Sequence, residues 1–219
     1  MTDKTLNTIV RRFGFDTEEF VNVLYRTGAY VAGGACLYGF LDKQMEETSD
    51  LDIWLPTPIT SPTEDSKAID YRYPVASRFY DFKHIAQDLF ELYLSKNGYI
   101  LDRTWTAKDD IVYRNIATDQ QFSKVVCRIQ TYTRLGKKVQ IISCYDISPQ
   151  DNLAGFDLNI CKFYCDPRTN GRTLKIKTVL SDAEVEAAKK GVGRVTVQVI
   201  SPNTSKRIEK YTRRGFTFI

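Results

Sequence analysis

Apolar and polar positions alternate along this chain with helical spacing in some segments and strand spacing in others. Residues 17–26 and 79–97 carry apolar side chains at i, i+3 and i+4, which predicts amphipathic helices. Residues 29–32 form a short apolar run, and residues 50–55 alternate polar with apolar, so both predict strands. Further helices are predicted over 35–43, 181–190 and 202–214, and further strands over 99–106, 111–116, 125–131, 138–144, 156–165, 173–179 and 194–200.

Because helices and strands are interspersed, the pattern predicts an α+β fold with a mixed β-sheet and flanking helices. The 219 residues, 42% of them hydrophobic, suffice for one domain or for a domain with a short extension. Residues 171–219 hold 11 Lys or Arg against 4 Asp or Glu, whereas the whole chain has a net charge of only +4. We therefore expect a main domain over residues 1–170 and a basic α/β extension over residues 171–219, packed on or next to it.

The basic residues of the extension gather on the predicted helix 202–214. Two interpretations stay open: this helix contacts nucleic-acid phosphates, or it has a solvated basic face. The five cysteines have apolar or aromatic neighbours, which is typical of buried free thiols and disfavours a disulfide framework. No segment has the apolar length of a membrane span, and the N-terminus lacks a signal-peptide pattern. We expect a cytoplasmic protein that has no membrane partner.

The most informative chemistry lies at Asp50 and Asp52. Side chains alternate between the faces of a strand, so these carboxylates point to one side while Leu51 and Ile53 point to the core. Two carboxylates about 4 Å apart repel by roughly 4 kcal/mol at an effective dielectric constant near 20. A cation between them, or protonation of one, relieves that repulsion. Oxygen ligands of this kind suit Mg²⁺ or Mn²⁺.

A glycine pair, Gly33-Gly34, separates the strand at 29–32 from the helix at 35–43. Glycines let a ligand approach the backbone closely, and the N-terminus of the following helix favours anions such as phosphates. Ser49, directly before the first aspartate, is by itself typical of a local backbone cap. The glycine turn therefore predicts a phosphate-binding element near the aspartate pair.

Two-metal phosphoryl transfer usually needs a third carboxylate. Asp157 is the candidate, because it lies in the strand-like run 156–165 that follows the apolar segment 138–144. The alternative is that it pairs with Lys162 or caps a turn. Asp146 and Asp151 are competing candidates nearby.

These residues resemble the nucleotidyltransferase superfamily, which includes DNA polymerase β-like enzymes, poly(A) polymerases and CCA-adding enzymes. The matching segments are residues 31–34 (VAGG), 49–53 (SDLDI) and 156–157 (FD). The resemblance covers about the first sixty residues and one later strand. The chain as a whole also resembles compact members of the superfamily from large DNA viruses and phages.

The resemblance implies transfer of a nucleoside monophosphate from a triphosphate to a hydroxyl acceptor, with release of pyrophosphate. It implies that Asp50, Asp52 and Asp157 are catalytic and hold Mg²⁺ or Mn²⁺, and that Gly33, Gly34 and Ser49 contact the triphosphate. The alternative function is a non-catalytic module of the same fold that binds nucleic acid or a partner protein.

Overall fold

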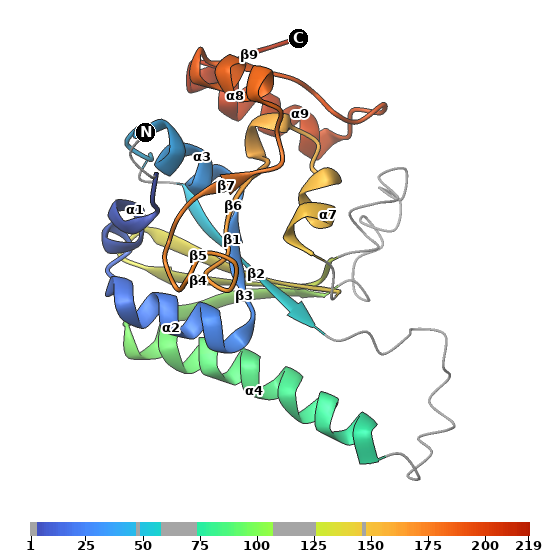
Figure 1. The fold of residues 1–219 in the computed structure, drawn as a ribbon. Coiled ribbons are helices and arrows are strands. Elements are labelled where there is room, and N and C mark those ends of the chain that lie inside the picture. The colour runs from blue at the N-terminus through green and yellow to red at the C-terminus, as the bar shows by residue number, and fades with distance from the viewer. Residues whose placement is uncertain (1–3, 47–48, 58–73, 107–125, 146–147) are drawn as a thin grey trace.

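A seven-stranded β-sheet forms the centre of the protein (Figure 1). The computed structural model describes residues 4–46, 49–57, 74–106, 126–145 and 148–219. The strand order is β3-β4-β5-β2-β1-β6-β7, and the neighbours β2 and β5 are parallel whereas the other pairs are antiparallel. The strands are β1 (Tyr30–Ala32), β2 (Asp50–Thr57), β3 (Ile100–Thr106), β4 (Val126–Arg134), β5 (Lys137–Tyr145), β6 (Phe163–Cys165) and β7 (Lys177–Thr178). The predicted α+β class with a mixed sheet and flanking helices is confirmed.

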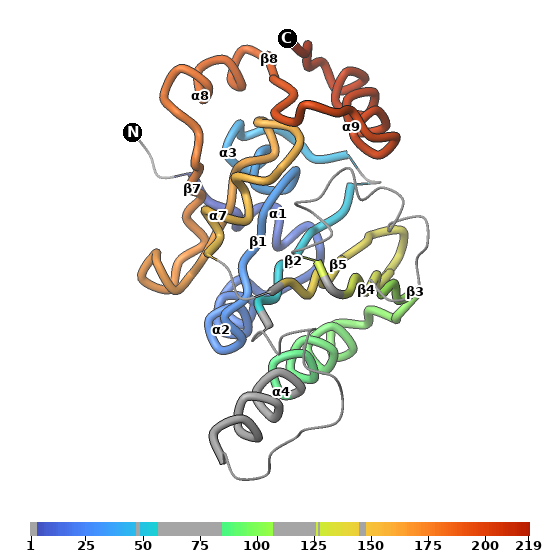
Figure 2. The backbone as a smooth tube through the Cα atoms, turned by 90° about the vertical axis from the view of Figure 1, so that its right-hand side faces the viewer, coloured from blue at the N-terminus to red at the C-terminus, as the bar shows by residue number. Residues whose placement is uncertain are grey.

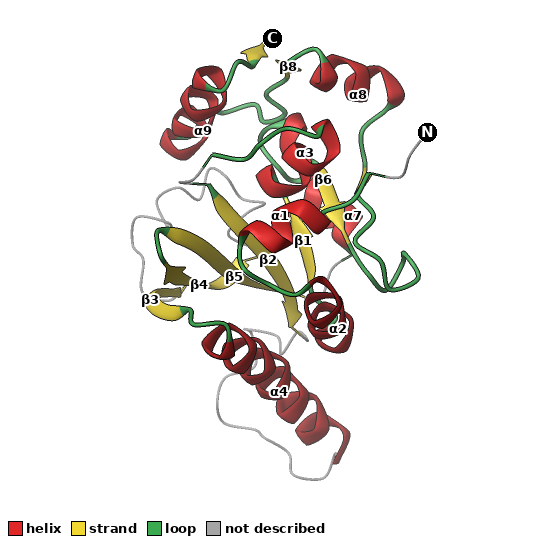
Figure 3. Ribbon diagram, turned by 90° about the vertical axis from the view of Figure 1, so that its left-hand side faces the viewer, coloured by secondary structure: helices red, strands yellow, loops and turns green. Residues whose placement is uncertain are grey.

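Helices α1 (Asn7–Arg12), α2 (Thr17–Thr27) and α4 (Pro74–Lys96) pack on one side of the sheet, where Figure 3 shows α2 and α4 next to each other. Their apolar side chains join those of Leu51 and Ile53 in the main core, and both of these β2 residues are fully buried. Burial of alternate β2 residues on this side leaves the intervening residues, including both aspartates, on the other face. The predicted orientation of β2 is therefore confirmed.

A smaller apolar cluster lies on the second face of the sheet, beside the helix α7 (Pro149–Ala154). Trp54 stacks on Tyr30 at a ring-centroid distance of 6.4 Å and packs against Phe156 at 5.4 Å. Leu153 of α7 is fully buried in this cluster. The second face is thus covered at its Trp54 end, which fixes one wall of the space in front of the aspartates.

The remaining elements are α3 (Gly34–Leu41), the 3-10 helix η1 (Asn159–Cys161), α8 (Asp182–Lys189), α9 (Pro202–Arg213), and the parallel pair β8 (Val192–Gly193) and β9 (Thr217–Phe218). Figure 2 shows α8 and α9 at the opposite end of the molecule from α4. The residues after 170 also contribute β7 to the main sheet. The division of the chain at residue 170 stays a prediction. No helix in the described part of the chain is long and apolar enough to cross a membrane.

Three strand predictions are wrong over most of their length: in the segment 173–179 only β7 is a strand, and the other two segments fail for a shared reason. The segment 156–165 is a strand only at its end, over β6, and the segment 194–200 contains no strand. The two segments bond to each other instead: the Thr196 N–H donates to the Asp157 carbonyl at 2.8 Å, and the Asn159 side chain accepts from the Arg194 N–H at 2.7 Å. This irregular pairing gives a single bridge between Leu158 and Val195. The predicted strand over 111–116 lies outside the described residues.

Candidate active site

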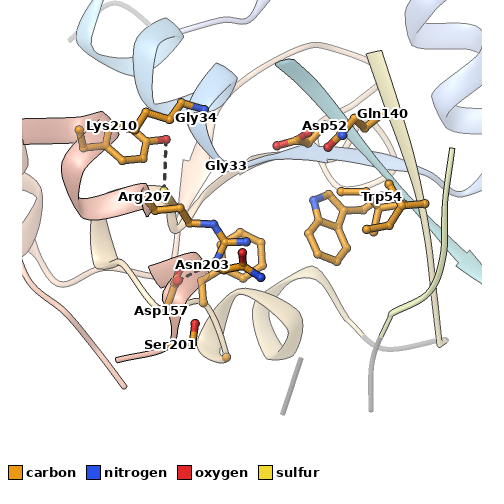
Figure 4. Close-up of a pocket in the computed structure, with 16 residues that line it drawn as sticks. Gly33, Gly34, Asp52, Trp54, Gln140, Asp157, Ser201, Asn203, Arg207 and Lys210 are labelled. Atoms are coloured by element: carbon orange, nitrogen blue, oxygen red, sulfur yellow. Dashed lines mark hydrogen bonds and ion pairs between the residues drawn. The ribbon is translucent and has the colours of Figure 1, made fainter. Parts of the chain in front are cut away.

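A pocket of about 280 Å³ lies where β2, the glycine turn and α9 meet. Asp52, Gly33 and Gly34 line one part of it, and Asp157 and Arg207 line another (Figure 4). An adjoining cavity of about 30 Å³ is lined by Asp50 and Ser49, and it shares Gly34, Asp52, Lys210 and Tyr211 with the larger pocket. All six predicted site residues therefore line one continuous region, in which Asp157 lies across the larger pocket from Asp52.

The paired carboxylates of Asp50 and Asp52 are electrostatically unsatisfied. The Oδ1 atom of each is buried and has no hydrogen-bond partner among the described residues. Burial, and after it the neighbouring Asp50, raise the pKa of Asp52 from 3.8 to about 7, although Lys210 and Arg207 act in the opposite direction. Buried carboxylate oxygens without donors suit a hard divalent cation, so the donor set fits Mg²⁺ or Mn²⁺.

The strand next to the aspartates does not supply a third carboxylate. In the parallel register of β2 and β5, Asp50 lies opposite Lys138 and Asp52 lies opposite Gln140. Gln140 lines the pocket, and its side-chain amide donates to the Thr131 hydroxyl at 3.3 Å. Residues in register on neighbouring strands share a face, so a neutral amide occupies the position closest to Asp52 on that strand.

Asp157 is held by the C-terminal helix. Its Oδ2 atom accepts a hydrogen bond from the Thr204 hydroxyl at 2.9 Å and from the Arg207 Nη1 at 2.6 Å, and its side chain is 9% exposed. In Figure 4 it lies on the opposite side of the pocket from Asp52. Among the described residues, no group of three or more His, Cys, Asp or Glu side chains is placed to hold a metal ion.

The predicted three-carboxylate cluster is therefore not formed in this structure. The prediction took Asp157 for a strand residue facing β2, whereas it precedes η1 and pairs with α9. The competitor Asp151 bonds to Ser148, the residue that caps α7. Asp146 lies outside the described residues. The carboxylates that the structure places together are Asp50 and Asp52.

The glycine turn has the predicted position, but its glycines are needed for reasons other than ligand access alone. Gly33 has a φ of +89°, a conformation that strains any residue with a Cβ, and its N–H donates to the Phe163 carbonyl at 3.0 Å. A Cβ on Gly34 would lie 2.8 Å from the Tyr211 hydroxyl. The first N–H groups of α3 have no partner within the helix, and no side chain of the residues that the structure describes caps it. These N–H groups are therefore the available phosphate donors of the turn.

Ser49 is buried and connects β2 to the end of α9. Its hydroxyl accepts a hydrogen bond from Arg214 at 2.8 Å, and its N–H donates to the Glu46 carbonyl at 3.1 Å. Arg214 also pairs with the Glu46 carboxylate at 2.6 Å, although only 5% of the Arg214 side chain is exposed. Ser49 thus positions the segment that leads into Asp50.

Helix α9 supplies a wall of the site that sequence reasoning missed. Arg207, Lys210, Tyr211 and Arg214 follow helical i, i+3, i+4 and i+7 spacing, which puts them on one face. Three of them line the larger pocket, and three line the smaller one. The spacing itself was visible in the sequence. The sequence contained no signal that this basic face turns towards the aspartates rather than towards solvent.

No protein-family model matches the chain, and no curated protein matches it. Solved structures do match. One is a CCA-adding enzyme in complex with CTP, with a TM-score of 0.49 and 14% identity. Another is a tRNA nucleotidyltransferase in complex with a primer tRNA and an incoming ATP analogue, with a TM-score of 0.43 and 12% identity. The alignments cover 100% and 98% of this chain but only 43% and 46% of those longer chains.

Proposed function

We propose that the protein is a metal-dependent nucleotidyltransferase that transfers a nucleoside monophosphate from a nucleoside triphosphate to a hydroxyl acceptor. The observation that carries the proposal is the pair of buried carboxylate oxygens on Asp50 and Asp52, which have no hydrogen-bond partner in the described part of the chain. They lie in a pocket that also contains the glycine turn before α3. The motif resemblance of residues 31–34 and 49–53 to nucleotidyltransferases supports the same chemistry.

Asp50 and Asp52 would hold Mg²⁺ or Mn²⁺. When bound, the metal neutralises charge on the triphosphate and stabilises the departing pyrophosphate. The first-turn N–H groups of α3 bind phosphate oxygens, with Gly33 giving the turn its shape. Ser49 acts indirectly, because its bond to Arg214 holds the start of β2. In the reaction, the acceptor oxygen bonds to the α-phosphorus, the bond from that phosphorus to the bridging oxygen breaks with its electron pair leaving on pyrophosphate, and the proton of the acceptor hydroxyl passes to solvent.

In this proposal, Asp157 anchors α9 and is not a metal ligand. Its carboxylate already pairs with Arg207 and accepts from Thr204 in the first turn of α9. A carboxylate near a helix N-terminus is favoured by the helix dipole as well. The role replaces the one that the family resemblance implied for this residue.

A second candidate function is a non-catalytic module. It would bind a metal–triphosphate complex without transferring the nucleotide, and its surface would bind a nucleic acid or a partner protein. The specific observation in its favour is Gln140, the neutral residue that lies in register with Asp52 on the neighbouring strand. With no third carboxylate beside the pair among the described residues, the site keeps its capacity for a cation but lacks one group that could accept the proton from an acceptor hydroxyl.

A nucleic acid is the acceptor that the basic α9 would suit. Lys206 and Arg213 are exposed on this helix, whereas Arg207 and Arg214 are paired with carboxylates. Only part of the basic helix is therefore available to contact phosphates, and such contacts would weaken as the salt concentration rises.

The test is a transfer assay with α-labelled ATP, CTP, GTP and UTP against RNA, DNA and protein acceptors, with Mg²⁺ or Mn²⁺. The proposal predicts label on one acceptor class, and no label when Asp50 and Asp52 are both replaced by Asn. The matched control replaces Asp88, an exposed aspartate of α4, with Asn. Transfer that survives the double replacement refutes the catalytic assignment. Metal-dependent triphosphate binding without any transfer supports the non-catalytic module.

A further inference from the structure

The inner face of α9 carries three cations that differ in what they contact. Arg207, near its start, pairs with Asp157 at 2.6 Å. Arg214, directly after its end, pairs with Glu46 at 2.6 Å and bonds to Ser49. These two residues therefore fasten the helix to the body of the protein at both ends.

Lys210 lies between these two anchors and has a different environment. It forms no ion pair with any carboxylate of the described residues, and its Nζ lies 6.0 Å from the centre of the Tyr211 ring. It lines the larger pocket and the smaller cavity, as do Asp52 and Gly34. Figure 4 shows Lys210 beside Gly34, the first residue of α3. A cation without a carboxylate partner therefore faces the helix N-terminus and the aspartate pair together.

We propose that Lys210 binds the triphosphate of the nucleotide, opposite the N-terminus of α3; this assignment rests on the proposed function. Two positive groups, the N-terminus of α3 and the Lys210 ammonium, would then flank the phosphates, and Asp50 and Asp52 would hold the metal that neutralises their charge. The assignment also gives α9 a role in nucleotide binding. Arg207 and Arg214 hold α9 in place so that Lys210 reaches the pocket.

A purely structural role for Lys210 makes a different prediction. Its charge acts on Asp52 at a distance, since it opposes the rise in the pKa of that residue. If Lys210 served only to reduce the electrostatic repulsion between Asp50 and Asp52, its removal would lower the free energy of unfolding without a specific loss of affinity for phosphate. Affinity for a phosphate ligand therefore separates the two roles.

Isothermal titration calorimetry with inorganic tripolyphosphate and Mg²⁺ tests the assignment on the full chain. Lys210→Gln is compared with Lys206→Gln, which removes the same charge from an exposed position of the same helix outside both cavities. We expect Lys210→Gln to weaken binding about tenfold, the loss of one charge-assisted hydrogen bond, and Lys206→Gln to change it less than about threefold. Lys210→Arg, which keeps a cationic donor, should recover most of the affinity even if the glutamine variant is less stable.

The outcomes distinguish the two proposals. Equal affinity in Lys210→Gln and Lys206→Gln overturns the assignment of Lys210, while the proposed function stands if the wild-type protein binds tripolyphosphate only with Mg²⁺. Absence of binding by the wild-type protein, both to tripolyphosphate and to nucleoside triphosphates, overturns the proposed function and the Lys210 assignment together. Loss of affinity that Lys210→Arg does not recover also contradicts the assignment, because it would reflect a structural defect.

Discussion

Replacing Asp52 with asparagine should stabilise the metal-free protein, and the gain should grow with pH. In the folded protein, burial and the neighbouring Asp50 raise the pKa of Asp52 from 3.8 to about 7. The folded state therefore keeps its proton between these two values while the unfolded state loses it. Below the lower value both states are protonated, so stability falls as the pH rises from about 4 to about 7 and is constant above that.

The size of the effect follows from the shift. A shift of about three pKa units corresponds to about 4 kcal/mol at about 1.4 kcal/mol per unit. Because Asp52 is only partly buried, solvent screening reduces this to about 2 to 3 kcal/mol in the metal-free protein above neutral pH. The asparagine variant has no charge to desolvate, so it escapes this penalty.

Urea denaturation with a chelator present, at about pH 5 and about pH 8, measures the difference. We expect the free energy of unfolding of Asp52→Asn to be higher than that of the wild-type protein. This difference should be about 2 kcal/mol larger at about pH 8 than at about pH 5. The exposed control Asp88→Asn should show no such dependence. Saturating Mn²⁺ should reverse the order, since it stabilises only the wild-type pair. A pH-independent difference, or a variant less stable than the wild type above neutral pH, would refute the reasoning.

Three other predictions follow from the same contacts. Asp157→Asn should destabilise the protein by about 1 to 3 kcal/mol through the loss of its ion pair, yet change the Mn²⁺ affinity less than twofold. A loss of Mn²⁺ affinity as large as that of Asp52→Asn would show that Asp157 is a metal ligand. Arg214→Gln should cost about 2 to 3 kcal/mol in thermal unfolding because its guanidinium is buried, and an unchanged melting temperature would contradict this. Gly34→Ala should lower phosphate binding and stability because its Cβ meets a tyrosine hydroxyl, and the second change Tyr211→Phe should restore part of the stability; absence of any rescue would show that the clash lies elsewhere.

Local sequence patterns sufficed for the parts of the site that are local in the chain. The alternation of β2 placed Asp50 and Asp52 on one face because strand periodicity depends on adjacent residues alone. The glycine turn was predictable for the same reason, since two adjacent glycines indicate a turn, and Gly33 indeed has a positive φ. In both segments the predicted and observed elements agree.

The rest of the site depends on contacts between segments far apart in the sequence. Asp157 is bound by residues 47 and 50 positions later, and Ser49 by an arginine 165 positions later. Nothing in the neighbourhood of Asp157 indicates that an arginine of α9 occupies its carboxylate. For this reason the sequence predicts Asp157 as a metal ligand and α9 as a basic face, but it does not predict that Asp157 and Arg207 of α9 form an ion pair.

Direct measurement of Mn²⁺ binding by electron paramagnetic resonance tests the central claim, that Asp50 and Asp52 hold a divalent cation. The account predicts a saturable Mn²⁺ site in the wild-type protein that strengthens when a nucleoside triphosphate is added, and loss of that site in the Asp50→Asn/Asp52→Asn variant. Mn²⁺ binding that is the same in the double variant, or absent from the wild-type protein with and without triphosphate, would contradict it.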